Sequence, residues 1–502
     1  MRPFASSFLA LPIALLLACG PGAVRADEHE TPEVAEPVRF ETTAEGRFGG
    51  TRVRYRVVAG EMHLHDEEGR PAAALFSTAY IAEDADENRP VTFVWNGGPG
   101  SASVWLHMGL LGPKRVRVAS EADEDDGAPP YRVEDNPATL LDLTDLVFVD
   151  PVGTGFSRVV GAGETSSYWS QQGDTDSIAT FMRRWVTEHD RWNAPRYIIG
   201  ESFGTTRAAA VADALMGDGQ DMALSGIVMV SQAMDYTGST PREDNLVAHV
   251  TYLPTMAATA WYHGRASVGL SLEEVVERAR AFATQIYLPA LFQGSALSEG
   301  ERRAVAQELA GLLGLDVDYV LRANLRVTVG RFTKELLRDA GRAIGRLDAR
   351  YTADDPDDTG ASPRLGDAAS NAITSAYTAA LNGYFADLGV RMDRPYLTGN
   401  GEVGRNWDYT VGPGSTGGEP AYVNTARNLS DALRKNGDLR VLVANGYYDL
   451  VTPFFDAEYT LGRHEILPDR VEMTYYEAGH MMYVRDADFD ALMQDIRAFY
   501  ED

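Results

Sequence analysis

A serine stands between two glycines at the junction of a predicted strand and a predicted helix. The pentapeptide GESFG at 200–204, with Ser202 at its centre, follows the apolar run YII at 197–199 and precedes an alanine-rich helical pattern at 205–215. Glycines on both sides of a serine permit a sharp strand-to-helix turn, which raises the hydroxyl above the sheet and points the helix N-terminus at it. The pattern predicts that Ser202 is a nucleophile.

Two downstream residues can activate this serine. A serine hydroxyl becomes a good nucleophile when a histidine takes its proton, and a carboxylate must hold that histidine in the right tautomer. Asp449 closely follows the apolar run at 439–444, and His480 follows the last predicted strand. His107 is the main competing histidine, but it precedes the serine and its surroundings predict a buried helical position. We therefore expect Ser202, Asp449 and His480 to form a catalytic triad.

A glycine-rich loop, NGGPG at 96–100, follows the buried run VTFVW at 91–95. Acyl transfer develops an oxyanion that needs preorganised N–H donors, and one of them normally belongs to the residue after the nucleophile, here Phe203. Gly97 or Gly98 can bring a second N–H close because no side chain intervenes. Taken alone, the loop is equally compatible with an ordinary glycine turn.

The elements that must position these residues follow an α/β pattern. Short alternating runs between 38 and 81 predict antiparallel strands at one sheet edge, and buried runs at 146–149 and 227–230 alternate with helical patterns. This succession predicts a mostly parallel central sheet with helices on both faces.

Helical patterns replace strands between 234 and 393, most clearly at 272–282, 302–313 and 332–349. The strand pattern then resumes near 439. We therefore expect a core formed by 38–233 and 394–502, interrupted by a helical cap insertion at 234–393.

Composition excludes several classes of function. The 502 residues carry 45 Lys and Arg against 73 Asp and Glu, a formal charge of −28, which disfavours binding to nucleic acid and to anionic lipid. The acidic loops at 121–127 and 354–360 lack the spacing of a calcium loop. We expect no metal and no cofactor.

The N-terminus resembles an export signal. An apolar stretch at 8–19 is too short to span a membrane, and it is followed by small residues. Cleavage after Ala26 and cleavage after Ala18, which would leave Cys19 lipidated, are both compatible with the sequence. Residues 27–37 predict a disordered leader. Cys19 is the single cysteine, so no internal disulfide can form. The protein is expected to be periplasmic, secreted or tethered by lipid, without a transmembrane segment.

Five ordered motifs resemble the serine carboxypeptidases of the α/β-hydrolase clan. They are WNGGPG at 95–100, DPVGTGFS at 150–157, GESFG at 200–204, NGYYD at 445–449 and GHM at 479–481. The resemblance implies removal of the C-terminal residue from peptides or proteins by an α/β-hydrolase fold with a helical cap. It assigns the triad as above and gives the oxyanion hole to the N–H groups of Gly98 and Phe203.

The same resemblance implies that Asn96 and Glu201 bind the substrate's terminal carboxylate. Two carboxylates repel each other unless one is protonated, so this arrangement predicts a preference for acidic conditions. The chain departs from the family pattern at Trp95, which directly precedes Asn96, and at Ser101, which replaces a cysteine. The position of the indole beside the substrate is therefore open.

Three alternatives remain. An esterase or acyltransferase could use the same scaffold, because a fold does not fix the substrate. A prolyl aminopeptidase-like enzyme also has a GGPG loop but would recognise an N-terminal amine. A catalytically inactive binding module is the third. The terminal residue preferred and the oligomeric state are not determined by the sequence.

Overall fold

The computed structural model describes residues 34–83, 85–86, 88–122, 128–217, 219–409 and 422–501. The predicted signal segment, Cys19 and the leader up to residue 33 lie outside the described residues.

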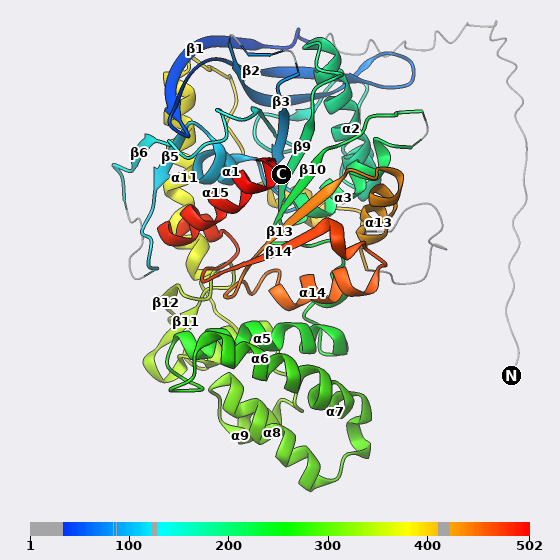
Figure 1. Cartoon of the computed structure of the whole chain (residues 1–502). Helices are drawn as coiled ribbons and strands as arrows, with labels where there is room; N and C mark the ends of the chain where they lie inside the picture. Colours follow the sequence, from blue (N-terminus) through cyan, green and yellow to red (C-terminus); the bar gives the residue numbers. More distant parts are fainter. Residues whose placement is uncertain are drawn as a thin grey trace, which may run out of the picture. The chain divides into compact units, whose positions relative to one another are not determined.

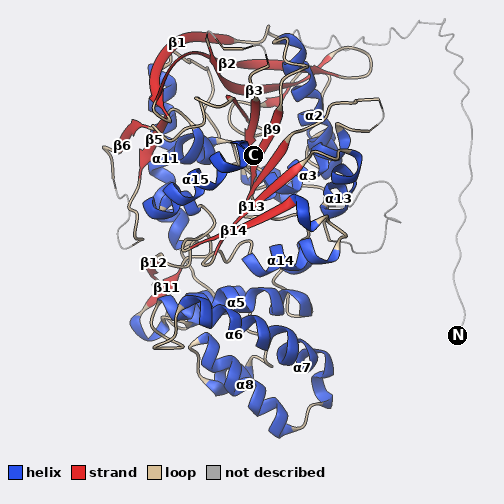
Figure 2. Ribbon diagram, viewed as in Figure 1, coloured by secondary structure: helices blue, strands red, loops and turns tan. Residues whose placement is uncertain are grey.

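One large sheet organises the described chain (Figures 1 and 2). Its first three strands are antiparallel, β3 pairs antiparallel with β7, and the strands from β7 to β14 run parallel. The two-residue strand β8 (Arg158–Val159) pairs with β3. The order across the sheet is β1 (Arg39–Phe48), β2 (Thr51–His65), β3 (Pro71–Ala82), β7 (Asp145–Val149), β4 (Val91–Trp95), β9 (Arg196–Glu201), β10 (Gly226–Val230), β13 (Arg440–Gly446), β14 (Val471–Tyr476).

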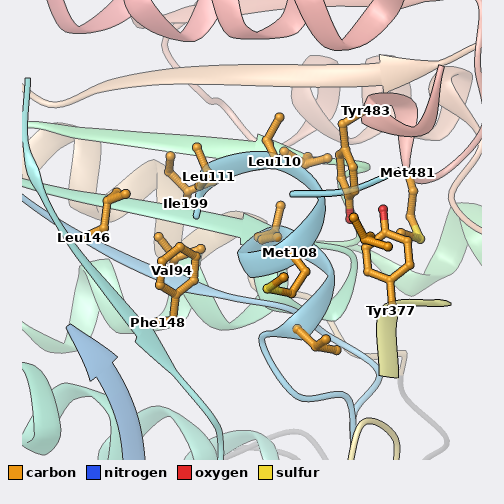
Figure 3. Packing of buried hydrophobic residues seen from close by; sticks show 14 of the residues in the cluster. Val94, Met108, Leu110, Leu111, Leu146, Phe148, Ile199, Tyr377, Met481 and Tyr483 are labelled. Atoms are coloured by element: carbon orange, nitrogen blue, oxygen red, sulfur yellow. The ribbon is translucent and has the colours of Figure 1, made fainter. Parts of the chain in front are cut away.

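The central strands are buried on both faces because their apolar residues alternate between two cores. In β13, Leu442 lies in one apolar cluster and Val441 in the other. Figure 3 shows the first cluster, where Val94 and Ile199 from the sheet face Leu110. Helices cover each face, as expected for a parallel sheet. The first face packs against α1 (Val104–Leu106), α11 (Ala368–Asp387) and α15 (Asp486–Glu501), and the second against α2 (Gln171–Glu188), α3 (Phe203–Ala214), α13 (Ala426–Lys435) and α14 (Phe454–Arg463).

A helical segment follows α4 (Tyr236–Ser239) and has an apolar cluster of its own. Two of its helices begin with a capping box, Ser271 with Glu274 and Ser298 with Glu301, which satisfies N–H groups at the helix start. The segment comprises α5 (Leu246–Tyr262), α6 (Leu272–Phe282), α7 (Leu288–Gln293), α8 (Glu299–Leu313), α9 (Val317–Arg322) and α10 (Val329–Glu335).

The helix predicted at 332–349 is wrong. Helix α10 ends at Glu335, and a short hairpin follows, formed by β11 (Arg342–Ile344) and β12 (Thr352–Asp354). Gly341 has a φ of +66°, a left-handed conformation that ends the helical path before the hairpin. The exact limits of a cap at 234–393 stay a prediction, since α11 packs on the sheet.

Three smaller elements complete the core: the paired strands β5 (Lys114–Arg117) and β6 (Arg132–Asp135), and the helix α12 (Gly401–Asn406). Among the described helices, none is long and apolar enough to cross a membrane.

Replacing Leu442 by alanine tests the buried centre of the sheet. Leu442 is fully buried in β13, so Leu442→Ala should lower the free energy of unfolding by about 2–5 kcal/mol through lost burial and a cavity. The matched control is Leu365→Ala, where the side chain is 59% exposed and the change should stay within about 0.5 kcal/mol. Urea unfolding measures the free energy of unfolding of both variants. Equal decreases in the two variants would contradict the packing described.

Candidate active site

Ser202 occupies a strained turn between β9 and α3. Its φ of 60° and ψ of −130° are rare for a residue with a side chain, and its N–H donates to the Val230 carbonyl at 3.0 Å. The flanking glycines pack against each other, because a Cβ at Gly200 would lie 2.4 Å from the Gly204 oxygen. The strand-turn-helix arrangement predicted for the pentapeptide is therefore present.

The glycine-rich loop lies directly on this turn. A Cβ at Gly97 would lie 2.4 Å from the Phe203 nitrogen and 2.7 Å from the Glu201 oxygen, so only glycine fits. Gly98 is exposed and has a φ of +106°, which a side chain would disfavour. Two backbone segments that could supply oxyanion donors thus meet beside Ser202.

Trp95 supports the turn from within the core. The indole is fully buried, and its N–H donates to the Gly204 carbonyl at 2.8 Å. Ser101, at the position of the family's cysteine, accepts a hydrogen bond from Trp105 Nε1 at 2.9 Å and forms a backbone bridge with Gly399. The loop is held without a disulfide at this position.

Asp449 and His480 are in direct contact at the ends of β13 and β14. Asp449 Oδ2 lies 2.7 Å from His480 Nδ1 and also accepts from Thr452 Oγ1 at 2.6 Å. Asp449 Oδ1 accepts the N–H groups of Val451 at 2.7 Å and Thr452 at 3.0 Å. The carboxylate is thus fixed by four contacts from three residues, and it fixes the imidazole through Nδ1, which leaves Nε2 unbound by Asp449.

The charge of Asp449 decides the protonation of His480. Burial by itself would lower the pKa of this histidine, but the Asp449 carboxylate, its hydrogen bond and the charge of Glu201 together raise the pKa above its usual value. By contrast, burial lowers the pKa of His107 to about 3, and His107 Nε2 lies 2.6 Å from the Tyr80 hydroxyl. The structure thus places His107 in the core, as expected.

Strand β10 brings the serine and the histidine loops together. Ser202 N–H bonds to Val230 O, and the next residue, Ser231, donates its hydroxyl to the His480 carbonyl at 2.7 Å. No hydrogen bond joins Ser202 Oγ to His480 among the described residues. Catalytic hydrogen bonds are often long before substrate binds, and the triad therefore stays a proposal built on this proximity.

A buried carboxyl group lies next to the serine. Glu201 is 3% exposed, and its Oε2 accepts from the Tyr483 hydroxyl at 2.6 Å. Burial raises the pKa of Glu201 to about 7, against the opposing effects of His480, Tyr483 and Asn96. Asn96 Oδ1 accepts the Leu106 N–H at 3.1 Å, so its buried amide Nδ2 is the group that remains to interact with Glu201 and lower its pKa. The structure therefore brings Asn96 and Glu201 together.

A second buried acid, Asp150, is hydrogen-bonded to the segment that follows the glycine-rich loop at 96–100. Asp150, from the DPVGTGFS motif, accepts from Ser103 N, Ser103 Oγ and the Tyr396 hydroxyl at 2.9, 2.8 and 3.0 Å. Burial raises the pKa of Asp150 to about 6. This contact ties the segment after Gly98 to the end of β7.

The loop between β11 and β12 reaches the loops that carry Asp449 and His480. Leu347 O accepts the His480 N–H at 2.7 Å, Arg346 O accepts the Leu450 N–H at 3.0 Å, and Ala349 N–H donates to Tyr448 O at 3.0 Å. The residues that flank Asp449 and the backbone of His480 are thus bonded to one short loop of the hairpin that follows the helical segment.

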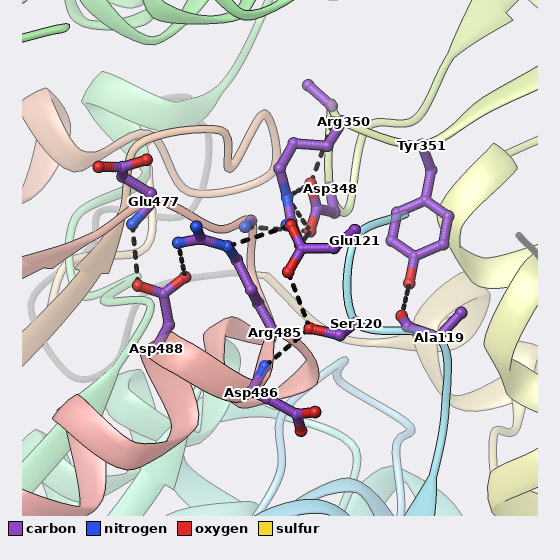
Figure 4. Close-up of polar contacts among 12 residues, drawn as sticks. Ala119, Ser120, Glu121, Asp348, Arg350, Tyr351, Glu477, Arg485, Asp486 and Asp488 are labelled. Carbon is purple, nitrogen blue, oxygen red and sulfur yellow. Dashed lines mark hydrogen bonds and ion pairs between the residues drawn. The ribbon is translucent and has the colours of Figure 1, made fainter. Parts of the chain in front are cut away.

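Asp348 lies in the same loop (Figure 4) and adds a further contact to the histidine loop. Its carboxylate accepts the Gly479 N–H at 3.2 Å and forms a buried ion pair with Arg350 at 2.6 Å. A Cβ at Gly479 would lie 2.4 Å from Asp348 Cβ, so the glycine before His480 is required by packing.

Sequence reasoning missed Thr452, Tyr483, Ser231 and Asp348. Thr452 and Tyr483 each lie three residues after a predicted triad member, which is the signal that could have drawn attention to them. Ser231 and Asp348 carry no such signal. In the described residues, no group of three or more His, Cys, Asp or Glu side chains could hold a metal ion.

Comparison with known proteins agrees with these motifs. Residues 52–264 match the profile of the family described as serine carboxypeptidase. Serine carboxypeptidase-like 34 of Arabidopsis thaliana is 30% identical over 162 residues, 31% of this chain and 29% of that protein. The pheromone-processing carboxypeptidase kex1 of Schizosaccharomyces japonicus is 32% identical over 169 residues, 31% of this chain and 27% of that protein. The match thus spans less than a third of each of these two relatives.

A solved structure shows the same fold. The prohormone-processing carboxypeptidase KEX1(delta)p of Saccharomyces cerevisiae superposes with a TM-score of 0.54 at 15% identity, over 89% of this chain and 91% of that one. The predicted α/β-hydrolase fold and the predicted resemblance to serine carboxypeptidases are both confirmed.

Replacing Asp449 should change the titration of His480. In Asp449→Asn the charge that raises the pKa of His480 is lost, and burial then dominates, so the pKa of His480 should fall. Nuclear magnetic resonance of isotope-labelled histidine follows the titration, with His480→Gln assigning the signal. Asp393→Asn, whose side chain is 92% exposed, is the control. An unchanged pKa in Asp449→Asn would show that the contact does not hold in solution.

Proposed function

We propose that this protein, a relative of the serine carboxypeptidases, is an exported enzyme that removes the C-terminal residue from peptides and proteins. Ser202 is the nucleophile, His480 the general base and acid, and Asp449 the carboxylate that orients the histidine. The observation that carries the proposal is a buried acid, Glu201, beside a serine that stands on a strained turn. An ordinary esterase has no need of an acid at this position.

The reaction proceeds through an acyl-enzyme. Ser202 Oγ bonds to the carbonyl carbon of the last peptide bond while its proton passes to His480 Nε2. The carbon–nitrogen bond then breaks, and the imidazolium gives its proton to the leaving amine, which departs as a free amino acid. Water, deprotonated by His480, adds to the acyl carbon and releases Ser202 with the shortened peptide.

Backbone N–H groups of Gly98 and Phe203 stabilise the oxyanion in both steps. The support for this assignment is the close approach of Gly97 to Phe203, which holds two backbone segments in place before the reaction begins. Preorganised donors of this kind contribute about 2.7–4 kcal/mol each to transition-state stabilisation in serine hydrolases.

Glu201 and Asn96 bind the terminal carboxylate of the substrate. A protonated Glu201 donates to that carboxylate, whereas an ionised one repels it. Asn96 is buried beside Glu201, and its amide Nδ2 supplies a second donor.

Protonation of Glu201 also favours the base form of His480. The negative charge of Glu201 is one of the causes that raise the pKa of His480, so a protonated Glu201 lets the histidine become neutral at lower pH. Both effects favour peptide hydrolysis under acidic conditions.

The N-terminal segment supports export. An apolar run at 8–19 ends in one cleavage signal, before Cys19, and is followed by a second, after Ala26. The intact mass of the exported protein distinguishes an enzyme released at Ala26 from one tethered by lipid at Cys19.

A free C-terminus should be required. We expect rapid, stepwise loss of C-terminal residues from a peptide acid, and a rate at least about tenfold lower for its C-terminal amide, because the amide cannot occupy the Glu201 site as an anion. Mass spectrometry of timed digests measures both rates. Ser202→Ala should lower the rate by about 10⁴-fold or more. Equal rates on the acid and the amide would favour an esterase-like or amidase-like enzyme instead.

Glu201→Gln should remove the alkaline limb of the pH profile. Glu201 has a pKa of about 7, so kcat/KM of the wild type should fall as pH rises through this value and the carboxyl loses its proton. Glutamine offers an N–H donor at every pH, so the variant should lack this decline. Glu68→Gln, 66% exposed, is the matched control and should keep the limb. If Glu201→Gln keeps the alkaline limb, Glu201 does not take part in carboxylate recognition.

A further inference from the structure

We propose that Tyr483 is a positioning residue for carboxylate recognition: its hydroxyl holds the Glu201 carboxyl so that the acidic proton of Glu201 is presented to the terminal carboxylate of the substrate. The inference rests on the proposed function and names the residue that tunes its carboxylate site.

The contact itself is short and buried. Tyr483 donates to Glu201 Oε2 at 2.6 Å, the tyrosine is fully buried, and the glutamate is 3% exposed. Burial lowers the local dielectric, which strengthens the hydrogen bond.

The space for the Tyr483 ring is created by a glycine in a different element. A Cβ at Gly109 would lie 2.5 Å from the Tyr483 ring and 2.7 Å from the Tyr377 hydroxyl, so the absence of a side chain at Gly109 lets both tyrosines approach. Gly109 lies in the π-helical turn η1 (His107–Leu111). Figure 3 shows the hydroxyl ends of Tyr483 and Tyr377 facing the same space.

The main chain of Tyr483 is fixed independently. Tyr483 lies in the turn η7 (Met482–Val484), three residues after His480, and Arg115 donates to its carbonyl at 3.0 Å. The guanidinium of Arg115 also lies over the ring of Phe489 at 3.7 Å. The hydroxyl is thus held on Glu201 by contacts at both ends of the residue.

This geometry selects where the proton of Glu201 resides. A neutral carboxyl has one O–H and one carbonyl oxygen, and the carbonyl oxygen is the acceptor. Because Oε2 accepts from Tyr483, the neutral form carries its proton on Oε1. That oxygen then donates to the incoming carboxylate.

The charges around the site fix the sign of the effect. Glu201 is faced by His480 and Tyr483 from the histidine loop, by Asn96 from the glycine-rich loop and by Asp449. Burial, together with the neighbouring Glu201 and Tyr377, raises the pKa of Tyr483 well above its usual value, so Tyr483 stays a donor. Its hydrogen bond favours the ionised form of Glu201, and removing it should raise the pKa of Glu201 further.

The test is the pH profile of Tyr483→Phe. On a peptide acid, the alkaline limb of kcat/KM should move to higher pH by about 1 unit, and KM at acidic pH should rise several-fold because the proton is no longer confined to Oε1. The rate at which an organophosphorus probe labels Ser202 should stay within about twofold, since that reaction needs the triad but no carboxylate site. A limb that does not move, or an equal loss in labelling, overturns the inference.

Three comparisons make the result specific. Tyr80→Phe removes another fully buried hydroxyl, bonded to His107, and should leave the limb unchanged. Adding Tyr483→Phe to Glu201→Gln should produce no further shift, because glutamine does not titrate. Difluorotyrosine at 483 keeps the ring and strengthens the donor, so it should move the limb to lower pH even where Tyr483→Phe does not fold.

Failure of the inference differs from failure of the proposed function. A wild type that removes C-terminal residues with an alkaline limb, and a folded Tyr483→Phe with the same limb, overturn the inference alone. A wild type that does not act on peptide acids overturns both.

Discussion

The active-site end of the sheet depends on how closely two stretches of backbone approach each other. Side chains cannot fit at Gly97, Gly200 or Gly204, because a Cβ there would meet backbone or ring atoms at 2.4–2.9 Å. Glycine is thus required by packing before any chemistry is considered. The same approach forces the left-handed turn at Ser202 and fixes nearby N–H groups in advance, and a donor that is already in place needs no reorganisation when negative charge develops.

Much of this end of the molecule could be predicted from the sequence. Ser202, Asp449 and His480 each follow a run of apolar residues, and parallel strands bring such positions to one edge of a sheet. The contact between Asp449 and His480 was therefore predictable, whereas the pairing of Asn96 with Glu201 came from the resemblance to serine carboxypeptidases. The mostly parallel sheet and the helices on both faces follow from the same alternation of buried runs and amphipathic segments, but the order of the strands does not.

The rest depends on packing that periodicity does not encode. Nothing in the pattern around Tyr483 says that its hydroxyl meets Glu201, because the space for its ring is created by Gly109 in a different element. The segment after Glu335 has the composition of a helix, yet it forms a hairpin through the left-handed turn at Gly341. Local propensity is a weak guide wherever tertiary contacts decide the path of the chain.

The loop from Arg346 to Arg350 joins the hairpin that follows the helical segment to the loops that carry Asp449 and His480. Its backbone and the Asp348 carboxylate bond to the chain beside Asp449 and to the residues of the histidine loop. A replacement of this loop must reproduce these bonds, because otherwise the backbone beside Asp449 and His480 loses the partners that hold it.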